Sequence, residues 1–182
     1  RDLPQLGVTI PAETLHRFWR MLAHHHGQLF NAHQLGASLG ISHPTVARYL
    51  DLMTGSFVVR RLEPLAANLG KRLVKSPKVY IRDSGLLHAL LGLRDEHELL
   101  GHPGAGPSWE SFVIEQLFGL APSGADLTFY RTIAGAELDL VLALGPKRYA
   151  FEIKYTAAPK PTRGFWLALD DLDIEHAWVV AP

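Results

Sequence analysis

Apolar residues in the first third of the chain recur at helical spacing. Between residues 12 and 26 they fall on one side of a helix, at Leu15, Phe18, Trp19 and Leu22. Residues 42–53 repeat this pattern, with Ser42 as a capping residue and an apolar face made of Val46, Tyr49, Leu50 and Met53. Between the two stripes, Asn31 can cap a shorter helix that runs to about Leu39 and ends at Gly40. Two short helices joined by a tight turn are typical of a helix-turn-helix.

Two strand-like segments follow these helices. Residues 57–62 and 78–81 are rich in β-branched and aromatic residues and flank a basic loop. Helices followed by such a strand pair predict a winged helix-turn-helix over residues 1–82. Residues 83–107 are then expected to form a connecting helix, capped by Asp83 or Ser84 and ending near Gly92, and a loop rich in glycine and proline.

The hydrophobic pattern changes in the last part of the chain, where Ser108 is expected to cap a new helix. The predicted order is helix, three strands, helix and strand, over residues 108–118, 127–132, 136–142, 149–155, 164–169 and 177–180. The turn-forming group Gly145-Pro146-Lys147 predicts that the second and third strands pair as an antiparallel hairpin. The expected fold class is therefore mixed α/β (α+β), with a second domain over residues 108–182.

Charged residues of the predicted hairpin fall at alternate positions. Glu137 and Asp139 share one face of the first strand, and Glu152 and Lys154 share one face of the second. Converging carboxylates are what a hard divalent ion such as Mg²⁺ binds, and a neighbouring lysine can stabilise developing negative charge. Charges on the solvent face of a hairpin are a common alternative. The apolar residues that flank Glu152 favour a central strand, in which a charged pair needs a reason.

This order of elements, with Glu110 on the first helix, Asp139 on the second strand and Glu152-x-Lys154 on the third, resembles the PD-(D/E)xK nuclease superfamily, which has an αβββαβ core. It is most similar to the branch with archaeal Holliday-junction resolvases and restriction-endonuclease-like domains. The resemblance implies that Glu110, Asp139 and Glu152 hold Mg²⁺ or Mn²⁺ and that Lys154 is the catalytic lysine. Leu138 stands where the motif often has proline, and Glu137 is either a second metal contact or a solvated neighbour.

Charge is unevenly divided although the net charge is zero. Residues 1–80 contain ten Lys and Arg against four Asp and Glu, and residues 81–182 contain eight against fourteen. A basic front part favours contact with phosphates. In a winged helix-turn-helix the third helix enters the major groove, so His43, Thr45 and Arg48 are candidate DNA contacts. Candidate phosphate contacts on the wing are Arg60, Arg61, Lys71, Arg72, Lys75 and Lys78.

Two features of the front part leave room for other interpretations. Winged helices also serve as protein-docking modules, which is the alternative to DNA binding here. The run His24-His25-His26 suggests a metal site, but adjacent residues on a helix point in different directions, so we interpret it as a polar helix end.

Composition restricts the kinds of site and the cellular compartment that are expected for the protein. The chain has no cysteine, which excludes disulfides and thiolate sites, and 47% of its residues are hydrophobic, enough for true cores. No apolar run has membrane-spanning length and no signal peptide is visible, so we expect a cytoplasmic protein. Because the chain begins at Arg1 rather than at methionine, we expect it to be part of a longer protein.

Short segments spread over the whole chain resemble the C-terminal region of prokaryotic AAA-type ATPases, which follows an N-terminal P-loop domain. They are Arg1-Asp2-Leu3-Pro4, the block at residues 82–87, Trp109-Glu110-Ser111-Phe112-Val113, residues 130–139 and Glu152-Ile153-Lys154. The resemblance implies an upstream ATPase domain as partner. This chain has no Gly-x-x-x-x-Gly-Lys-Ser/Thr motif, so it should hold no ATP site itself.

These observations lead to two hypotheses for the function. The first is a metal-dependent nuclease domain that hydrolyses phosphodiester bonds in DNA, positioned by the winged helix. The second is a catalytically inactive module of the ATPase that binds nucleic acid or protein and regulates it. Assembly into oligomers is compatible with either.

Overall fold

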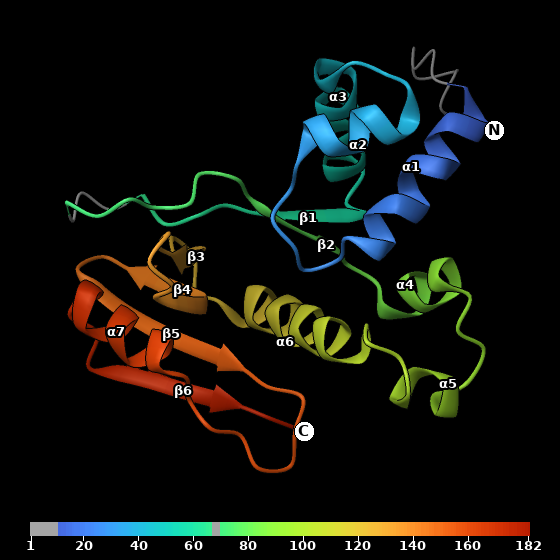
Figure 1. Ribbon diagram of the computed structural model, residues 1–182. Coiled ribbons are helices and arrows are strands. Elements are labelled where there is room, and N and C mark those ends of the chain that lie inside the picture. Colours follow the sequence, from blue (N-terminus) through green and yellow to red (C-terminus); the bar gives the residue numbers. More distant parts are fainter. Residues whose placement is uncertain (1–10, 67–69) are drawn as a thin grey trace.

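The computed structural model describes residues 11–66 and 70–182 as a mixed α+β protein (Figure 1). The segment Arg1-Asp2-Leu3-Pro4, on which part of the ATPase resemblance depends, lies outside the described residues. The N-terminal part contains three helices followed by a strand pair: α1 (Ala12–His24), α2 (Ala32–Leu39), α3 (His43–Gly55), β1 (Val59–Leu62) and β2 (Lys78–Ile81).

Local capping fixes the ends of α2 and α3 as the sequence predicted. The Asn31 side chain accepts a hydrogen bond from the backbone N–H of Gln34 at 3.1 Å. Gly40 ends α2 in the left-handed conformation, with φ of 69°, which glycine adopts without strain. Ser42 Oγ accepts from the N–H of Thr45 at 3.4 Å and begins α3.

The apolar stripes predicted for α1 and α3 form one core. Phe18, Leu22, Val46 and Leu50 are almost completely buried and pack with Val59 of β1. β1 pairs antiparallel with β2, with Val59 opposite Ile81, and Leu29 forms a bridge to Lys78 on the other side of β2. β2 is therefore paired on both sides, and all four of its residues are buried.

The chain then passes through two short helices into the C-terminal part. α4 (Ser84–Leu91) is capped by Asp83 and ends at Gly92, as expected, and α5 (Glu96–Leu100) was not predicted. The elements that follow are α6 (Ala105–Leu120), β3 (Asp126–Arg131), β4 (Glu137–Leu144), β5 (Lys147–Ile153), α7 (Arg163–Leu172) and β6 (His176–Val180). Their order agrees with the predicted order of helix, three strands, helix and strand.

Helix α6 begins at Ala105, three residues before the predicted cap Ser108. Ser108 does not cap this helix but lies inside it, and its N–H donates to the carbonyl of Gly104 at 2.9 Å. Pro107 falls in the first turn, where a missing N–H costs nothing because the first backbone donors of a helix have no partner within it. The helix therefore begins inside the segment that its glycines and prolines had marked as a loop.

The four strands of the C-terminal part form one sheet in the order β3-β4-β5-β6 (Figure 1). β3, β4 and β5 are antiparallel neighbours, and β6 runs parallel to β5. Adjacent residues of a strand point to opposite faces, and Val141 packs with Phe165 of α7 while Leu140 packs with Ile114 of α6. The two helices therefore cover opposite faces of the sheet.

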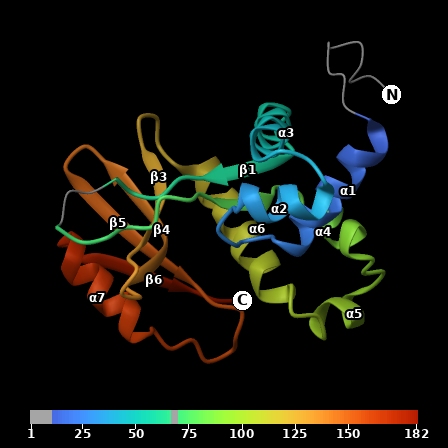
Figure 2. The same cartoon turned by 45° about the horizontal axis from the view of Figure 1, so that its top comes forward.

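Residues 63–65 and 72–74 of the segment between β1 and β2, which was expected to be a wing, lie along β3 (Figures 1 and 2). Pro64 bridges to Phe129 and Leu73 to Thr132, and the N–H groups of Leu65 and Val74 donate to carbonyls of β3 at 2.7 and 2.9 Å. β3 is an end strand of the four-stranded sheet, so these contacts satisfy backbone groups that would otherwise form an open sheet edge.

One hydrophobic core is shared by the two parts of the protein. Leu62 of β1 and Tyr80 of β2 pack with Ile114 of α6, Phe129 of β3 and Leu140 of β4. These side chains are 0–1% exposed. The shared core therefore holds β2 against the sheet, which places a side chain of the N-terminal part beside the charged end of the hairpin.

Candidate functional site

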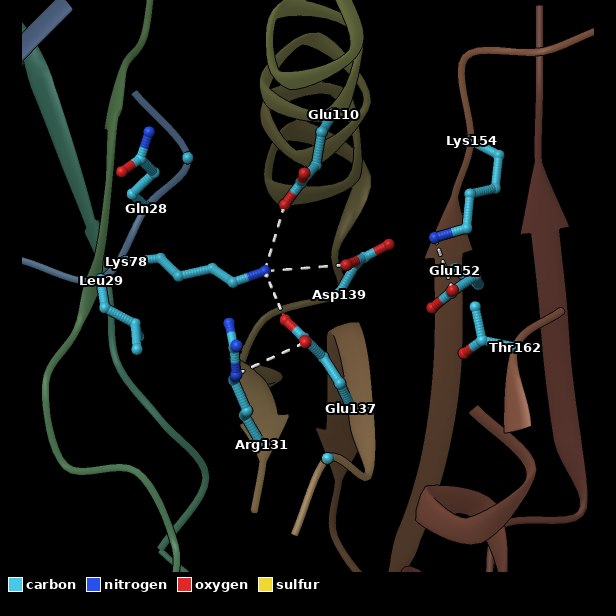
Figure 3. A pocket seen from close by; sticks show the side chains of 12 residues that line it. Gln28, Leu29, Lys78, Glu110, Arg131, Glu137, Asp139, Glu152, Lys154 and Thr162 are labelled. Atoms are coloured by element: carbon cyan, nitrogen blue, oxygen red, sulfur yellow. Dashed lines mark hydrogen bonds and ion pairs between the residues drawn. The ribbon is translucent and has the colours of Figure 1, made fainter. Parts of the chain in front are cut away.

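A cavity of about 520 Å³ opens between β2, α6 and the ends of β4 and β5 (Figure 3). Its charged lining comes from five secondary-structure elements and the residue that follows β5. The lining residues are Lys78, Glu110, Arg131, Glu137, Asp139, Glu152 and Lys154. All four residues that the nuclease resemblance implied, Glu110, Asp139, Glu152 and Lys154, are in this set.

Glu110 reaches the cavity from the second turn of α6. Its Oε1 accepts a hydrogen bond from the hydroxyl of Tyr80 at 2.6 Å and lies 3.4 Å from Lys78 Nζ. Burial raises the pKa of the Glu110 carboxyl, and the positive charge of Lys78 opposes this shift in part. Glu110 is thus held by two side chains of the neighbouring strand β2.

Glu137 and Asp139 extend from the same face of β4, as the alternation of strand side chains predicted. Asp139 Oδ2 accepts a hydrogen bond from the backbone N–H of Ile153 at 2.9 Å, which ties β4 to the end of β5. Glu137 Oε2 pairs with Arg131 Nε at 3.5 Å. The remaining oxygens of both carboxylates face Lys78.

Glu152 and Lys154 form a pair at the end of β5, with 2.7 Å between Oε1 and Nζ. Burial, followed by the nearby charge of Asp139, raises the pKa of Glu152 to about 7. Burial alone would lower the pKa of Lys154, but its hydrogen bond with Glu152 and the charge of Asp139 raise it. Lys154 therefore carries its proton at neutral pH.

Lys78 lies at the centre of the carboxylates (Figure 3). Its Nζ is 3.1 Å from Glu137 Oε1, 3.4 Å from Glu110 Oε1 and 3.6 Å from Asp139 Oδ1. Burial alone would lower the pKa of the ammonium group, but the charges of Glu110, Asp139 and Glu137 raise it well above its ordinary value. The interpretation of Lys78 as a phosphate contact on the wing is therefore wrong, because its side chain is only 5% exposed.

The sequence contained a weak signal for this position of Lys78. The run Lys78-Val79-Tyr80-Ile81 does not alternate between polar and apolar residues, which is typical of a strand that is covered on both faces. A charged residue that begins such a strand needs buried partners of opposite charge. Nothing in the sequence shows that those partners lie on α6 and β4.

The carboxylates are suited to a divalent ion in chemistry but not in their present arrangement. Among the residues that the structure describes, no group of three or more His, Asp or Glu side chains is arranged to hold a metal ion. Oxygen ligands bind Mg²⁺ and Mn²⁺, and four carboxylates line the cavity. Three of those carboxylates are paired with Lys78, so the ammonium group now fills the space between them.

The predicted DNA contacts of α3 are at the start of that helix, on the surface. His43 is exposed and stacks on His33, with 4.3 Å between the ring centroids. Thr45 Oγ1 lies 2.8 Å from Ser42 Oγ, within the capping turn. Arg48 follows one turn later and is exposed.

The predicted phosphate contacts of the strand pair are separated by the fold. Arg60 is bound to Glu115 of α6, with 2.9 Å between Nη2 and Oε2, and stacks over Phe118. Arg61 pairs with Asp51 and Glu63 at the surface, and Lys71 pairs with Asp171 of α7. Arg72 is exposed beside Lys71. A phosphate contact by Arg60 would require its buried ion pair to break.

The histidine run at the end of α1 is divided by the structure. The helix ends at His24 and His25 is its C-cap, as expected for a polar helix end. His26 instead turns inward and is 5% exposed, and its Nδ1 accepts a hydrogen bond from the N–H of Ile81 at 3.0 Å.

Comparison with known proteins places the chain in a family. Residues 1–97, more than half of the chain, match the family described as a domain of unknown function (DUF8612). The chain belongs to this family. Residues 105–182 match a second domain of unknown function, DUF4143, so the DUF8612 match covers the N-terminal part and the DUF4143 match covers the carboxylate-bearing elements α6, β4 and β5.

Curated relatives of this DUF8612 chain are longer than the chain itself. It is 51% identical over 183 aligned residues to the uncharacterised proteins Rv2008c of Mycobacterium tuberculosis and Mb2031c of Mycobacterium bovis. The alignment covers all of this chain but 41% of each relative. The chain therefore spans about two-fifths of the length of these relatives.

One solved structure has a distant likeness to the chain. It is MepR, a transcription regulator of the Staphylococcus aureus multidrug efflux pump MepA, with 16% identity and a TM-score of 0.33 over 66% of this chain and 85% of MepR. A TM-score this low does not establish a shared fold.

Over residues 11–66 and 70–182, none of the helices has the length and apolar character needed to cross a membrane.

Proposed function

We propose that residues 105–182 form a PD-(D/E)xK-type nuclease module that hydrolyses phosphodiester bonds in DNA. The observation that supports this most directly is that Glu110, Asp139, Glu152 and Lys154 line one cavity. They come from α6, β4 and the end of β5, in the order that an αβββαβ nuclease core requires. Convergence of these four residues from distant segments is not needed to complete any apolar core.

Each residue of the module has a distinct role in this proposal. Glu110, Asp139 and Glu152 would hold Mg²⁺ or Mn²⁺, and such an ion would lower the pKa of a bound water and offset negative charge on the phosphate. Lys154 keeps its proton because Glu152 lies 2.7 Å away, so it adds positive charge beside the scissile phosphate. Asp139 is held in place by the N–H of Ile153.

We propose that the N-terminal part is a winged helix-turn-helix that positions DNA. The order of three helices and an antiparallel strand pair supports this, together with the start of α3, where His43 and Arg48 are exposed and Thr45 is partly exposed. Because Arg60 and Lys71 are engaged in ion pairs, phosphate contacts would come chiefly from α3 and from Arg72.

The curated relatives contain a further region that this chain lacks. The chain spans 41% of its curated relatives. We propose that the rest of such a protein contains a P-loop ATPase domain and acts with this chain in the cytoplasm. ATP hydrolysis by the full-length protein, abolished by substitution of the P-loop lysine, would support this arrangement.

A second function is favoured by the position of Lys78. An ammonium group among Glu110, Glu137 and Asp139 offsets part of their negative charge without any metal ion. Such a site suits a catalytically inactive module that binds nucleic acid or protein and regulates the ATPase. The two functions differ in whether the cavity binds a divalent ion and cleaves DNA.

The experiment that tests the nuclease proposal joins metal binding to cleavage. Mn²⁺ and Mg²⁺ are titrated into the chain by calorimetry, with and without DNA, and cleavage of duplex, branched and single-stranded DNA is followed on gels. Asp139→Asn keeps an oxygen that can accept from Ile153, and Asp126→Asn, at an exposed position of β3, is the matched control. We expect the first variant to lose both signals and the second to keep them. Absence of metal binding and cleavage in the wild type, with DNA present, would favour the inactive regulatory module.

A further inference from the structure

Lys78 is a fixed part of the cavity rather than a surface side chain that has folded inward. β2 is paired with β1 on one side and bridged to Leu29 on the other, so it keeps Lys78 at the cavity for as long as the N-terminal part is docked. The side chain is 5% exposed and its Nζ lies 5.5 Å from the centroid of the Phe129 ring. Tyr80, two residues along the same face of β2, binds the same carboxylate, Glu110.

The ammonium group has the coordination that a bound cation would have. Three carboxylate oxygens from α6 and β4 surround it at 3.1–3.6 Å. A divalent ion with oxygen ligands needs them at about 2.0–2.6 Å. The same oxygens cannot surround both cations, and a divalent ion at contact distance from an ammonium group is repelled by it. Binding of a metal ion by these carboxylates therefore requires Lys78 to leave.

We propose that Lys78 is an internal cation that competes with a divalent ion for Glu110, Glu137 and Asp139. The inference rests on the proposed metal site and adds a control to it. Lys78 is carried by β2, which belongs to the N-terminal part, while its carboxylate partners belong to the C-terminal part. Metal occupancy is then coupled to the docking of the N-terminal part: a shift of β2 away from α6 withdraws the lysine and frees the carboxylates.

The segment between β1 and β2 is a route by which a ligand could move β2. The segment that connects β1 to β2 is hydrogen-bonded along β3 through Leu65 and Val74 (Figure 2). Ligand binding at residues 63–65 or 72–74, or at α3, would act on the strand that carries Lys78. In the docked state Lys78 occupies the space between the carboxylates, and a metal ion must displace it to bind there.

Mn²⁺ binding to purified variants of the full 182-residue chain tests the proposal. Lys78→Met keeps the apolar stem and removes the charge, Lys78→Arg keeps the charge, and Lys75→Met changes an exposed lysine near the start of β2. We expect Lys78→Met to bind Mn²⁺ at least about tenfold more tightly than the wild type, because one repelling charge has been removed. Lys75→Met and Lys78→Arg should bind no more tightly than the wild type.

The location of the added binding is checked by a double variant. Adding Asp139→Asn to Lys78→Met should remove the gain in Mn²⁺ affinity. If Lys78→Met does not fold without metal, Lys78→Gln, whose amide can still donate to a carboxylate, is measured instead. Equal affinity of the wild type and both neutral variants would overturn the proposal.

The results also separate this inference from the nuclease proposal. Tight Mn²⁺ binding by the wild type at Asp139, unchanged in Lys78→Met, would overturn the role of Lys78 and leave the metal site standing. A gain of Mn²⁺ affinity in Lys78→Met without any cleavage of DNA would support the role of Lys78 and remove the nuclease function.

Discussion

Individual buried polar residues in this protein are stabilised by partners that lie far away in the sequence. His26 is the simplest case. Its Nδ1 accepts a hydrogen bond from the N–H of Ile81, and its ring packs in a T-shaped arrangement with the ring of Tyr80, with 5.4 Å between the centroids. The ring must be neutral at Nδ1 to accept this bond. Burial, with a contribution from the positive charge of His88, lowers the pKa of His26 to about 4.

We predict that His26 makes the protein less stable in mildly acidic solution. The ordinary pKa of 6.5 applies in the unfolded chain and about 4 in the folded protein, so the unfolded state binds the proton first as pH falls. Stability is unaffected by His26 above pH 6.5 and declines between pH 6.5 and 4, by up to about 3 kcal/mol. Urea unfolding at successive pH values measures this loss.

Burial also raises the pKa of Glu110 and of Glu152, so the contribution of His26 is taken from a comparison of variants. His26→Gln should show a shallower decline between pH 6.5 and 4 than the wild type. His16→Gln, at an exposed position of α1, should follow the wild-type curve. Parallel curves for the wild type and His26→Gln would mean that the histidine is already charged in the folded protein.

At the scale of elements, α6 is the helix whose placement matters most for the site. It carries Glu110 into the cavity, and five residues later it carries Glu115 to the strand pair. Glu115 Oε2 accepts from Arg60 of β1 and from Arg82, just after β2, at 2.9 Å each. Burial would raise the pKa of Glu115, but the hydrogen bonds from Arg60 and Arg82 lower it below its ordinary value. This ion pair joins α6 to β1 and to the end of β2.

We predict that Glu115→Gln destabilises the protein by about 2–3 kcal/mol, because two arginines lose their charged partner in a largely buried position. Amide hydrogen exchange should increase in β1 and α6 together. Glu96→Gln, an exposed change on α5, serves as the control and should leave the unfolding free energy within about 0.5 kcal/mol of the wild type. A loss no larger than that of the control would show that apolar contacts alone position α6.

Elements were predictable from the sequence where the determining signal is local. The caps at Asn31 and Ser42 and the glycine at position 40 fix helix ends through bonds that reach three or four residues along the chain. The start of α6 was missed because its glycines and proline are tolerated in the first turn, so composition alone marked a loop. Local signals therefore define the elements better than they define their boundaries.

The candidate site was predictable only in part for the same reason. Alternation along β4 and β5 places Asp139 and Glu152 without knowledge of the rest of the fold. The position of Lys78 depends instead on the docking of β2 against α6, which brings together residues 32 positions apart in the chain. Ion pairs of Arg60 and Lys71 across 55 and 100 positions likewise remove charges that the sequence had assigned to a DNA-binding surface.

The molecule as a whole has no clean boundary between its two parts. Leu62 and Tyr80 from the N-terminal part complete a core whose other members lie in α6 and the sheet. The segments on either side of residues 67–69 cover the β3 edge with backbone hydrogen bonds. Each part therefore lacks buried surface and hydrogen-bond partners when it is alone. Because the two parts share these contacts, the folding free energy of each part depends on its docking against the other.

We therefore predict that the intact chain unfolds in one cooperative step. Residues 105–182 alone should not form a stable folded structure. Without β1 and β2, the side chains of Ile114 and Phe129 lose apolar partners, and Glu110, Glu137 and Asp139 lose the only cation that touches all three among the described residues. Exposed apolar surface and unpaired buried carboxylates both favour unfolding. Calorimetry should give a single transition for the chain, while residues 105–182 alone should show no sharp transition by circular dichroism. Two separate transitions in the intact chain, one of them matched by a folded 105–182 fragment, would contradict a shared core.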